Sequence, residues 1–559
     1  MFPLPNPAGF GATDWIELLL AAVLLLLALG WRPWLEPLAR RVSEGPLWSM
    51  LLLAALPVAL RLILLPHHPA PSPDVYDEFG HLLVADTLRH LRLANPAHAL
   101  SQFFETFFVL QDPTYSSIYP VGQGLVLAIG WTLFGLPWAG VLLAVAAFCA
   151  LCYWMLRAWT TPGWALAGGL LAVFEFGPLS VWMNSYWGGA VAAAAGCLVF
   201  GALPRLRGEP RTRDAVLLGI GLGMHLLVRP FESIFLFLAA ASFLVPGARR
   251  LRKVAPDLAL ALVPFAVIML FQNKAVTGSW TTMPEMLSQY QYGVPSALTF
   301  QPNPVPHREL TPQQQLDYRM QTSFHGPRTD TVGSYLLRLE YRVRYYRFFF
   351  FAPLYLALAA FVAALREYRF VWVVLVLLLF ALGTNFFPAF QVHYIAAVTG
   401  LFVLMSVTGL ERLSRLKTGG REASTVLVFL CVAQFLFWYG AHLFEKAEAA
   451  RAVQPYETWD AINHASPVRR IYVNNLLAGL PGKLLVFVRY YPRHIFQDEW
   501  VYNAADIDGA RVVWARDLGA EEDEKLIRYY PGRRVLLLEP DQPVPKLAEY
   551  QPQAPAIIP

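Results

Sequence analysis

The sequence contains about twelve apolar runs that are long enough to cross a lipid bilayer as helices. A spanning helix needs roughly 20 mostly apolar residues. Only 15% of the residues are charged, whereas soluble globular proteins carry about 25%. We therefore predict a polytopic α-helical membrane protein, with spans near 14–31, 46–65, 138–157, 163–183, 186–204, 214–228, 231–247, 256–275, 348–365, 370–386, 393–410 and 423–443.

A further apolar stretch, 119–135 (YPVGQGLVLAIGWTLFG), is rich in glycine and decides the predicted topology. Short loops rich in Lys and Arg stay on the cytoplasmic side of a membrane. All the basic loops share one side only if 119–135 does not cross, so we predict an interfacial or re-entrant helix there. Both termini, the loops 66–137 and 276–347, the tip near 184–189 and the tail 444–559 then lie outside. The basic loops are 32–41, 205–213, 248–253, 366–369 and 411–421.

The composition changes at about residue 444, where apolar runs become shorter and charges and prolines increase. The runs 483–491, 510–517 and 533–540 are typical of buried strands bounded by turn residues, and 520–530 of a short helix. The sequence therefore predicts a membrane module over 1–443 and a small exoplasmic α/β domain over 444–559.

An acidic cluster follows the second predicted span, in SPDVYDEFGHLLVADTL (72–88). The apolar spacing predicts a helix from Asp77 onward, with Ser72 or Asp74 as its cap. Acidic residues are ordinary in a first helical turn, so a capped juxtamembrane helix explains the cluster. The alternative is a general base or metal ligand at the membrane surface.

The order of features over about 46–410 resembles the GT-C class of membrane glycosyltransferases. It is most similar to the protein mannosyltransferases and the lipid A aminoarabinose transferases. These features are the pair Asp77 and Glu78 after an early span, an amphipathic helix, the aromatic segment SQFFETFFVLQDPTYSSIYP (101–120) and an interfacial helix before a bundle of spans. The chain departs from the pattern in having one proline, Pro120, and no lysine before the interfacial helix.

The resemblance implies that Asp77 deprotonates an acceptor hydroxyl and that Glu78 orients Asp77 or the acceptor. An inverting transfer needs one base on the face opposite the leaving group. The implied donor is a sugar linked to a polyprenyl phosphate, and the implied acceptor is a protein, a lipid or a glycan. The implied location is the outer face of a bacterial inner membrane, in contact with membrane lipids.

An anionic lipid headgroup calls for an arginine at the outer surface. Arg229 ends a short span (VLLGIGLGMHLLVRP, 216–230) and is predicted to contact the donor phosphate, with Glu232 as its partner. Snorkelling to headgroups is the alternative. A second basic segment, LRLEYRVRYYRF (337–348), contributes Arg347 as a candidate, although such a segment also binds anionic headgroups generally.

Other polar residues at outer turns are candidates for substrate contacts, each with ordinary packing or anchoring as the alternative. They are Asp74, His81, Asp112, Tyr115, Asn184, Tyr186, Gln391, His393 and Tyr394. No metal site is predicted, although a divalent cation stays open as an alternative. Its oxygen and nitrogen ligands would be Asp74, Asp77, Glu78 and His81. No other cofactor is predicted.

The remaining signals exclude several classes of protein. Cys149, Cys152, Cys197 and Cys431 lie within apolar runs, so they are predicted to be small buried side chains. The sequence has no P-loop, HExxH or nucleophile elbow, and a net charge of +5 gives no indication of nucleic-acid binding. A secondary transporter and a non-catalytic scaffold with an exoplasmic binding domain remain as alternatives. Transport is disfavoured because the polar residues gather at one face of the bundle instead of mid-span.

Overall fold

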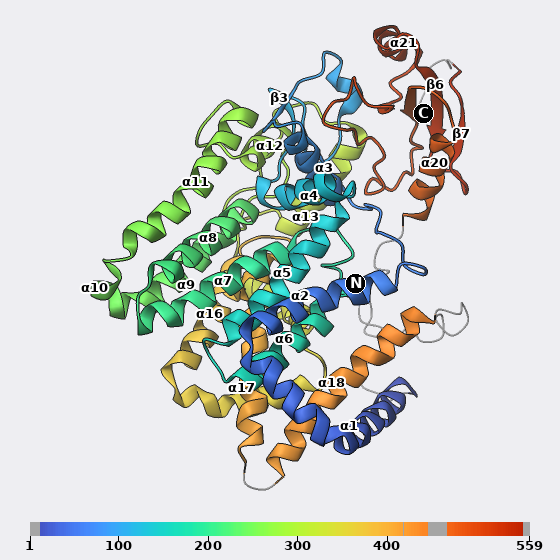
Figure 1. Cartoon of the computed structure of the whole chain (residues 1–559). Coiled ribbons are helices and arrows are strands. Elements are labelled where there is room, and N and C mark those ends of the chain that lie inside the picture. The colour runs from blue at the N-terminus through green and yellow to red at the C-terminus, as the bar shows by residue number, and fades with distance from the viewer. Residues whose placement is uncertain (1–11, 417–418, 445–466, 552–559) are drawn as a thin grey trace.

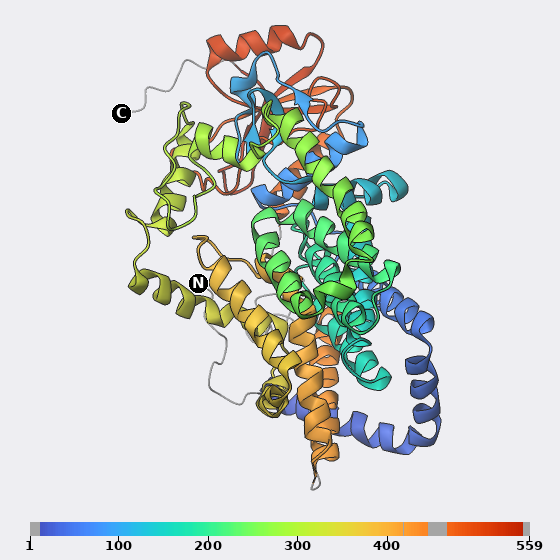
Figure 2. The same ribbon diagram turned by 90° about the vertical axis from the view of Figure 1, so that its left-hand side faces the viewer.

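The computed structural model describes residues 12–416, 419–444 and 467–551. A bundle of apolar helices carries two long loops at one end, and a small C-terminal sheet lies beside those loops (Figure 1). α17 (Thr399–Ser414) ends and α18 (Gly420–Leu443) begins at the opposite end (Figure 2). The loops 66–137 and 276–347 and the C-terminal segment therefore share one end of the molecule. The two loops are called the first and second outer loops after their predicted side of the membrane.

Seven helical segments in the described ranges are long and apolar enough to cross a bilayer, or eight if a pair bent by 109° counts as one span. The chain is thus a multi-pass membrane protein, but the predicted number of about twelve spans is not confirmed. The seven are α2 (Pro46–Ile63), α5 (Trp138–Leu156), α7 (Gly189–Gly208), α9 (Pro230–Leu244) with η2 (Val245–Gly247), α11 (Ala255–Thr277), η5 (Val392–Val398) with α17 (Thr399–Ser414), and α18 (Gly420–Leu443).

The other helices of the bundle are shorter or carry more charge. They are α1 (Ala12–Glu44), α4 (Val121–Phe134), α6 (Pro162–Phe176), α8 (Thr212–Val228), α10 (Ala248–Leu251), α15 (Leu354–Phe361), η4 (Val362–Arg366) and α16 (Tyr368–Thr384).

Three predicted boundaries in this bundle are wrong. The predicted basic loop 32–41 is helical and continues α1, with Pro33 and Pro37 inside the helix. The predicted span 163–183 ends at Phe176, because Pro178 disfavours a helical conformation at Gly177. The predicted span 348–365 is not one continuous helix. The preceding helix, η3 (Arg344–Phe349), ends at the extended Phe350, and α15 starts only after Pro353, which lacks the N–H that would continue η3.

The first outer loop contains α3 (Tyr76–Arg89), η1 (Ser101–Phe104) and the short strands β1 (Asn95–Pro96), β2 (Val109–Leu110) and β3 (Thr114–Ser117), in the antiparallel order β1-β3-β2. The glycine-rich stretch then forms α4. Its Gly122 lies against the end of α8, where an added Cβ would come within 2.6 Å of the Leu227 carbonyl oxygen. This close approach brings the start of α4 next to Arg229.

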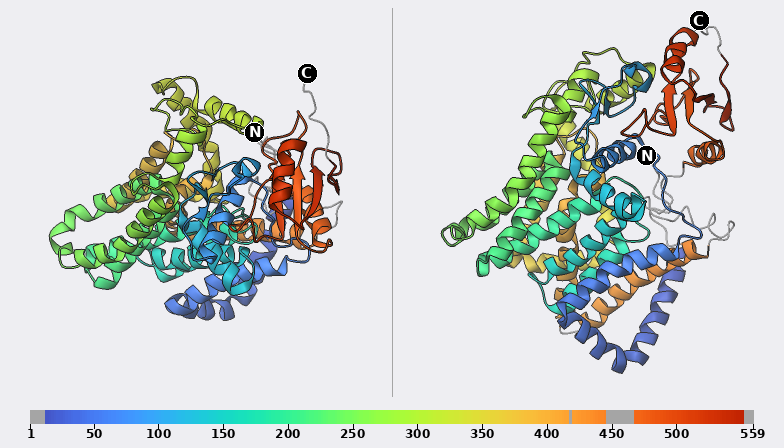
Figure 3. Two further views of the ribbon diagram at one scale, coloured as in Figure 1. Left: turned by 90° about the horizontal axis from the view of Figure 1, so that it is seen from above. Right: turned by 45° about the horizontal axis from the view of Figure 1, so that its top comes forward.

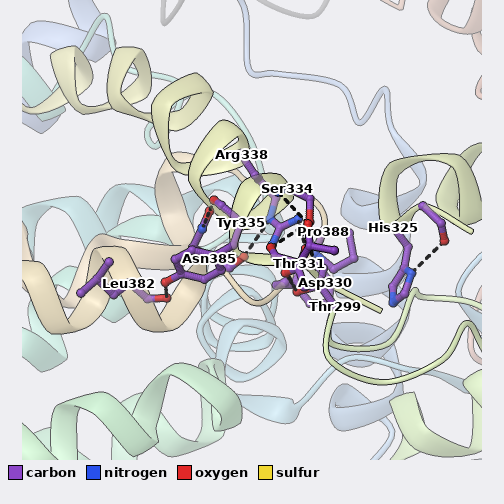
Figure 4. Close-up of polar contacts among 12 residues, drawn as sticks. Thr299, His325, Asp330, Thr331, Ser334, Tyr335, Arg338, Leu382, Asn385 and Pro388 are labelled. Atoms are coloured by element: carbon purple, nitrogen blue, oxygen red, sulfur yellow. Dashed lines mark hydrogen bonds and ion pairs between the residues drawn. The ribbon is translucent and has the colours of Figure 1, made fainter. Parts of the chain in front are cut away.

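The second outer loop contains α12 (Pro284–Tyr292), α13 (Pro312–His325), α14 (Val332–Val343) and η3 (Arg344–Phe349). The buried Glu105 of the first loop holds it, because its carboxylate pairs with Arg308 and accepts hydrogen bonds from Tyr292 Oη (3.1 Å) and Gln314 Nε2 (3.3 Å). At the other end of the loop, Arg338 pairs with Asp330 and donates to the Asn385 carbonyl at 2.8 Å (Figure 4).

The C-terminal segment forms α20 (Val468–Ala478), β4 (Leu484–Val488), β5 (Val512–Arg516), α21 (Ala520–Tyr529), β6 (Arg534–Glu539) and β7 (Lys546–Glu549). The strand order is β5-β4-β6-β7, parallel except for β7. β4, β5, β6 and α21 lie where the sequence predicts them, whereas α20 and β7 were not predicted. Residues 445–466 of the predicted domain lie outside the described residues. One face of the sheet packs on α20, and the other packs on the first outer loop (Figures 2 and 3).

Candidate active site

The acidic pair lies at the start of α3, which begins at Tyr76. Ser72 and Asp74 do not cap this helix, contrary to prediction, because the Glu78 carboxylate reaches back and accepts from the backbone N–H of Asp74 (2.9 Å) and Val75 (3.3 Å). A glutamate at the third helical position commonly does this. The other Glu78 oxygen accepts from the Tyr186 N–H at 3.0 Å, so Glu78 fixes the tip 184–189 to the first outer loop.

Glu78 is only 3% exposed, and burial raises its pKa to about 7 against the pull of three backbone N–H groups. The hydrogen bonds that its carboxylate accepts come from backbone N–H groups. These contacts position the first turn of α3, and with it the neighbouring Asp77.

Asp77 is the carboxylate of the pair that faces other candidate site residues. Burial raises its pKa above the ordinary value for aspartate, while a hydrogen bond from the Tyr119 hydroxyl and the charge of Arg229 oppose this shift. Tyr119 reaches Asp77 because Gly80 leaves room, since a Cβ at Gly80 would be 2.7 Å from the Tyr119 ring. The carboxylate thus lies within electrostatic range of the Arg229 guanidinium.

His81 lies one helical turn after Asp77 and is buried. Its ring packs on that of Tyr119, with centroids 4.2 Å apart. Burial and the nearby Arg229 charge lower its pKa to about 3, so the imidazole is neutral. Its Nδ1 has no hydrogen-bond partner among the described residues.

Arg229 is the single residue between α8 and α9, and it ends one helix and begins the next. Its guanidinium lies 4.6 Å from the centroid of the Tyr394 ring, and Nη1 is 4.0 Å from Glu232 Oε1. The side chain is 20% exposed. No other ion pair or side-chain hydrogen bond of Arg229 is present within the described ranges, so much of its donor capacity is unused.

η5 contributes His393 and Tyr394 to the same place. The His393 ring lies 5.0 Å from Tyr394 and 5.4 Å from Trp187, and the Arg229 charge acts on both η5 side chains. The structure therefore brings together five of the predicted site residues, from three parts of the chain: Asp77, His81, Arg229, His393 and Tyr394.

Other candidates make scaffold contacts instead. Asn184 accepts a hydrogen bond from Arg61 Nε at 2.7 Å, and the Tyr186 hydroxyl donates to the Pro71 carbonyl at 2.8 Å. The Tyr115 hydroxyl donates to the Asn503 carbonyl at 3.0 Å, between the first outer loop and the C-terminal segment. The carbonyl of Asp112 accepts from Gln291.

The basic segment before α15 is also largely structural. Arg342 is buried and donates to the carbonyls of Thr384, Phe387, Pro388 and Ala389, which fixes the chain after α16. Arg347 lies within electrostatic range of Tyr355 on α15, and Asp74 lies within range of Arg470 in the C-terminal segment. Neither belongs to the group around Arg229.

Two carboxylic acids that the sequence did not indicate lie near this group. Glu285 on α12 interacts with Glu232 and Arg229, and Asp317 on α13 interacts with Asp77. Burial raises the pKa of each to about 7. No group of three or more His, Cys, Asp or Glu in the described parts of the chain has an arrangement that holds a metal ion.

No protein-family model matches this chain, and comparison with curated proteins gives no match. Among solved structures, the chain is similar to ArnT from Cupriavidus metallidurans, in the apo state (TM-score 0.49) and bound to undecaprenyl phosphate (0.48). Each alignment has 12% identity and covers 87% of this chain and 92% of ArnT. The apo oligosaccharyltransferase of Archaeoglobus fulgidus aligns with a TM-score of 0.37 at 12% identity, over 79% of this chain and 62% of that one.

ArnT is a lipid A aminoarabinose transferase, and both kinds of protein are GT-C glycosyltransferases, the class that the sequence resembles. The likeness concerns the fold, and function has to be inferred from the residues of this chain.

Proposed function

We propose that this protein transfers a sugar, with inversion, from a polyprenyl-phosphate-linked donor to an acceptor hydroxyl at the outer face of a bacterial inner membrane. The C-terminal α/β domain is then exoplasmic. The observation that carries the proposal is the placement of the Asp77 carboxylate within electrostatic range of the Arg229 guanidinium, at the end of the bundle where the long loops gather.

Asp77 is the proposed general base. Burial raises its pKa toward neutrality, which makes its carboxylate a stronger base than that of an exposed aspartate. In the transfer, the acceptor oxygen forms a bond to the anomeric carbon and its proton passes to Asp77. The bond from that carbon to the phosphate oxygen breaks, and its electron pair leaves with the lipid phosphate.

Arg229 is the proposed partner of that leaving phosphate. A guanidinium presents several N–H donors in a plane and binds phosphate oxygens through charge-assisted hydrogen bonds. The Tyr394 ring holds the plane in place, and the 4.0 Å separation from Glu232 leaves the donors available. The negative charge that develops on the phosphate is thus neutralised without a proton donor.

Undecaprenyl phosphate, which one of the ArnT structures binds, is a suitable probe of the proposed function. We expect the full-length protein in lipid nanodiscs to bind undecaprenyl phosphate at least about tenfold more tightly than undecaprenol, because a charge-assisted hydrogen bond contributes about 1.5–3 kcal/mol. Native mass spectrometry of the two lipids in competition measures this ratio. Equal binding of the phosphate and the alcohol would contradict the proposal.

Tyr119→Phe tests the role of Asp77 through pH. The substitution removes the hydrogen bond that stabilises the carboxylate, so the pKa of Asp77 rises further. Activity needs the ionised base, which exists above this pKa. We therefore expect the acid limb of the kcat/KM profile to move to higher pH.

The matched control for this profile is Tyr115→Phe. Tyr115 lies in the same loop as Tyr119, and its hydroxyl donates to the Asn503 carbonyl of the C-terminal segment. The acid limb of this variant is expected to stay in place. A profile of Tyr119→Phe that coincides with that of the wild type would show that Asp77 does not set the limb.

A further inference from the structure

Asp317 presents a buried carboxylate oxygen that has no partner. The residue lies on α13 of the second outer loop and its exposed fraction is 0%. Its Oδ2 accepts a hydrogen bond from Gln321 Nε2 at 3.0 Å, whereas Oδ1 has no partner among the described residues. Leaving a buried polar atom unpaired is costly, and such an atom in a folded protein calls for an explanation.

Tyr502 of the C-terminal segment presents a second unpaired group close to Asp77. Its ring stacks on Phe79, two residues after Asp77, with centroids 4.3 Å apart and an interplanar angle of 1°. Its hydroxyl is buried and lies near that of Thr106, but the two hydroxyls are not in hydrogen-bonding geometry. Asp77 acts electrostatically on the Tyr502 hydroxyl.

Tyr76 connects these groups. Its ring packs on that of Phe108, with centroids 4.9 Å apart, in the apolar cluster that also contains Tyr318 of α13. The charges of Asp317 and Asp77 both act on its hydroxyl, and burial raises its pKa well above the ordinary value. The first outer loop, the second outer loop and the C-terminal segment therefore meet beside Asp77.

We propose that Asp317, Tyr502 and Tyr76 form the subsite that holds the acceptor next to Asp77, and that this acceptor is a saccharide. The inference rests on the proposed transfer reaction. Arg229 and Tyr394 supply the cationic part of the site. The second group consists of one carboxylate and two hydroxyls, and its nearby cation, Arg470, lies over the Phe79 ring at 4.5 Å from the centroid and acts on Tyr502. Asp77 lies next to both groups. A base that takes a proton from the acceptor has to lie beside the acceptor as well as the donor.

The chemistry of the unpaired atoms favours a saccharide. Asp317 Oδ1 and the Tyr502 hydroxyl need partners that both donate and accept, and neighbouring sugar hydroxyls provide them. A serine or threonine side chain of a protein acceptor brings only one hydroxyl. A phosphorylated group is disfavoured because Asp77 and Asp317 both lie here.

An array of immobilised saccharides tests the subsite with the full-length protein in nanodiscs. We expect the wild type to bind a defined set of saccharides, and Asp317→Asn and Tyr502→Phe to lower this binding at least about tenfold. Glu309→Gln, which neutralises an exposed carboxylate of the same loop, is the matched control and is expected to bind like the wild type. Tyr502→Phe removes only a hydroxyl, so it tests the subsite even if Asp317→Asn fails to fold.

Binding of undecaprenyl phosphate separates the two proposals. Asp317→Asn and Tyr502→Phe are expected to bind this lipid like the wild type. A wild type that binds undecaprenyl phosphate but no saccharide, or variants that keep full saccharide binding, would overturn the acceptor subsite alone. Loss of the preference for undecaprenyl phosphate over undecaprenol would instead overturn the proposed function.

Discussion

Asp77→Asn is expected to slow sugar transfer by about 10²–10⁴-fold while the protein stays folded and keeps its affinity for undecaprenyl phosphate. The amide still accepts the hydrogen bond of the Tyr119 hydroxyl, so the start of α3 keeps its structure. It is not basic enough to take a proton from the acceptor. General base catalysis contributes about 10²–10⁴-fold, and we expect a loss of kcat within this range. Single-turnover transfer from an undecaprenyl-phosphate-linked sugar measures it.

Asp86→Asn is the matched control, because Asp86 is the other aspartate of α3 and is buried. Its Oδ2 accepts from the Ala505 N–H at 2.8 Å, and so it helps to fix the C-terminal segment to the first outer loop. The amide oxygen can still accept this bond. We expect a modest loss of stability and a rate within about threefold of the wild type. If Asp86→Asn and Asp77→Asn lost the same fraction of kcat, Asp77 would have no special chemical role.

Arg229→Gln is expected to weaken the binding of undecaprenyl phosphate by roughly 10- to 150-fold. The estimate corresponds to about 1.5–3 kcal/mol for a hydrogen bond to a charged group. The same substitution removes the charge that lowers the pKa of Asp77, so the acid limb of the kcat/KM profile also moves to higher pH. Lysine at this position keeps the charge but loses the planar array of donors, so Arg229→Lys is expected to bind with intermediate affinity.

Arg344→Gln distinguishes a specific contact from general attraction to the membrane. Arg344 stacks on the Tyr341 ring at 3.5 Å in the basic segment before α15, and it has no role in the proposed site. Its loss is expected to change the affinity for undecaprenyl phosphate by less than about twofold, as for a typical surface substitution. Similar losses in Arg344→Gln and Arg229→Gln would indicate that the whole basic surface, and not Arg229, attracts the lipid.

The position of Asp317 depends on how the second outer loop packs, because α13 belongs to that loop. The buried Glu105 holds that loop against the first one, and Arg516 of the C-terminal sheet donates to the Glu105 carbonyl at 2.6 Å. The proposed acceptor subsite thus depends on contacts among three segments that are far apart along the chain.

The sequence determined the features that depend on a local pattern of apolar and polar residues. Apolar runs predict helices because a membrane admits little else, and the strands β4, β5 and β6 follow from short apolar runs between turn residues. Asp77 was singled out because the acidic cluster after an early span resembles the GT-C pattern, and Arg229 because it carries a charge at the end of an apolar segment. The predicted number of spans is not confirmed, and hydropathy does not detect the break before Pro353 or the end of α6 at Phe176.

Only the tertiary structure decided which polar side chains meet. Glu78 and Asp77 are neighbours in sequence, yet one binds backbone N–H groups and the other faces Arg229, because successive residues of a helix point in different directions. Asp317 and Tyr502 carry no local signal, since a lone acid in a polar helix and a lone tyrosine in a loop are ordinary. Their place beside Asp77 comes from the packing of distant segments, and a sequence pattern does not encode such packing locally.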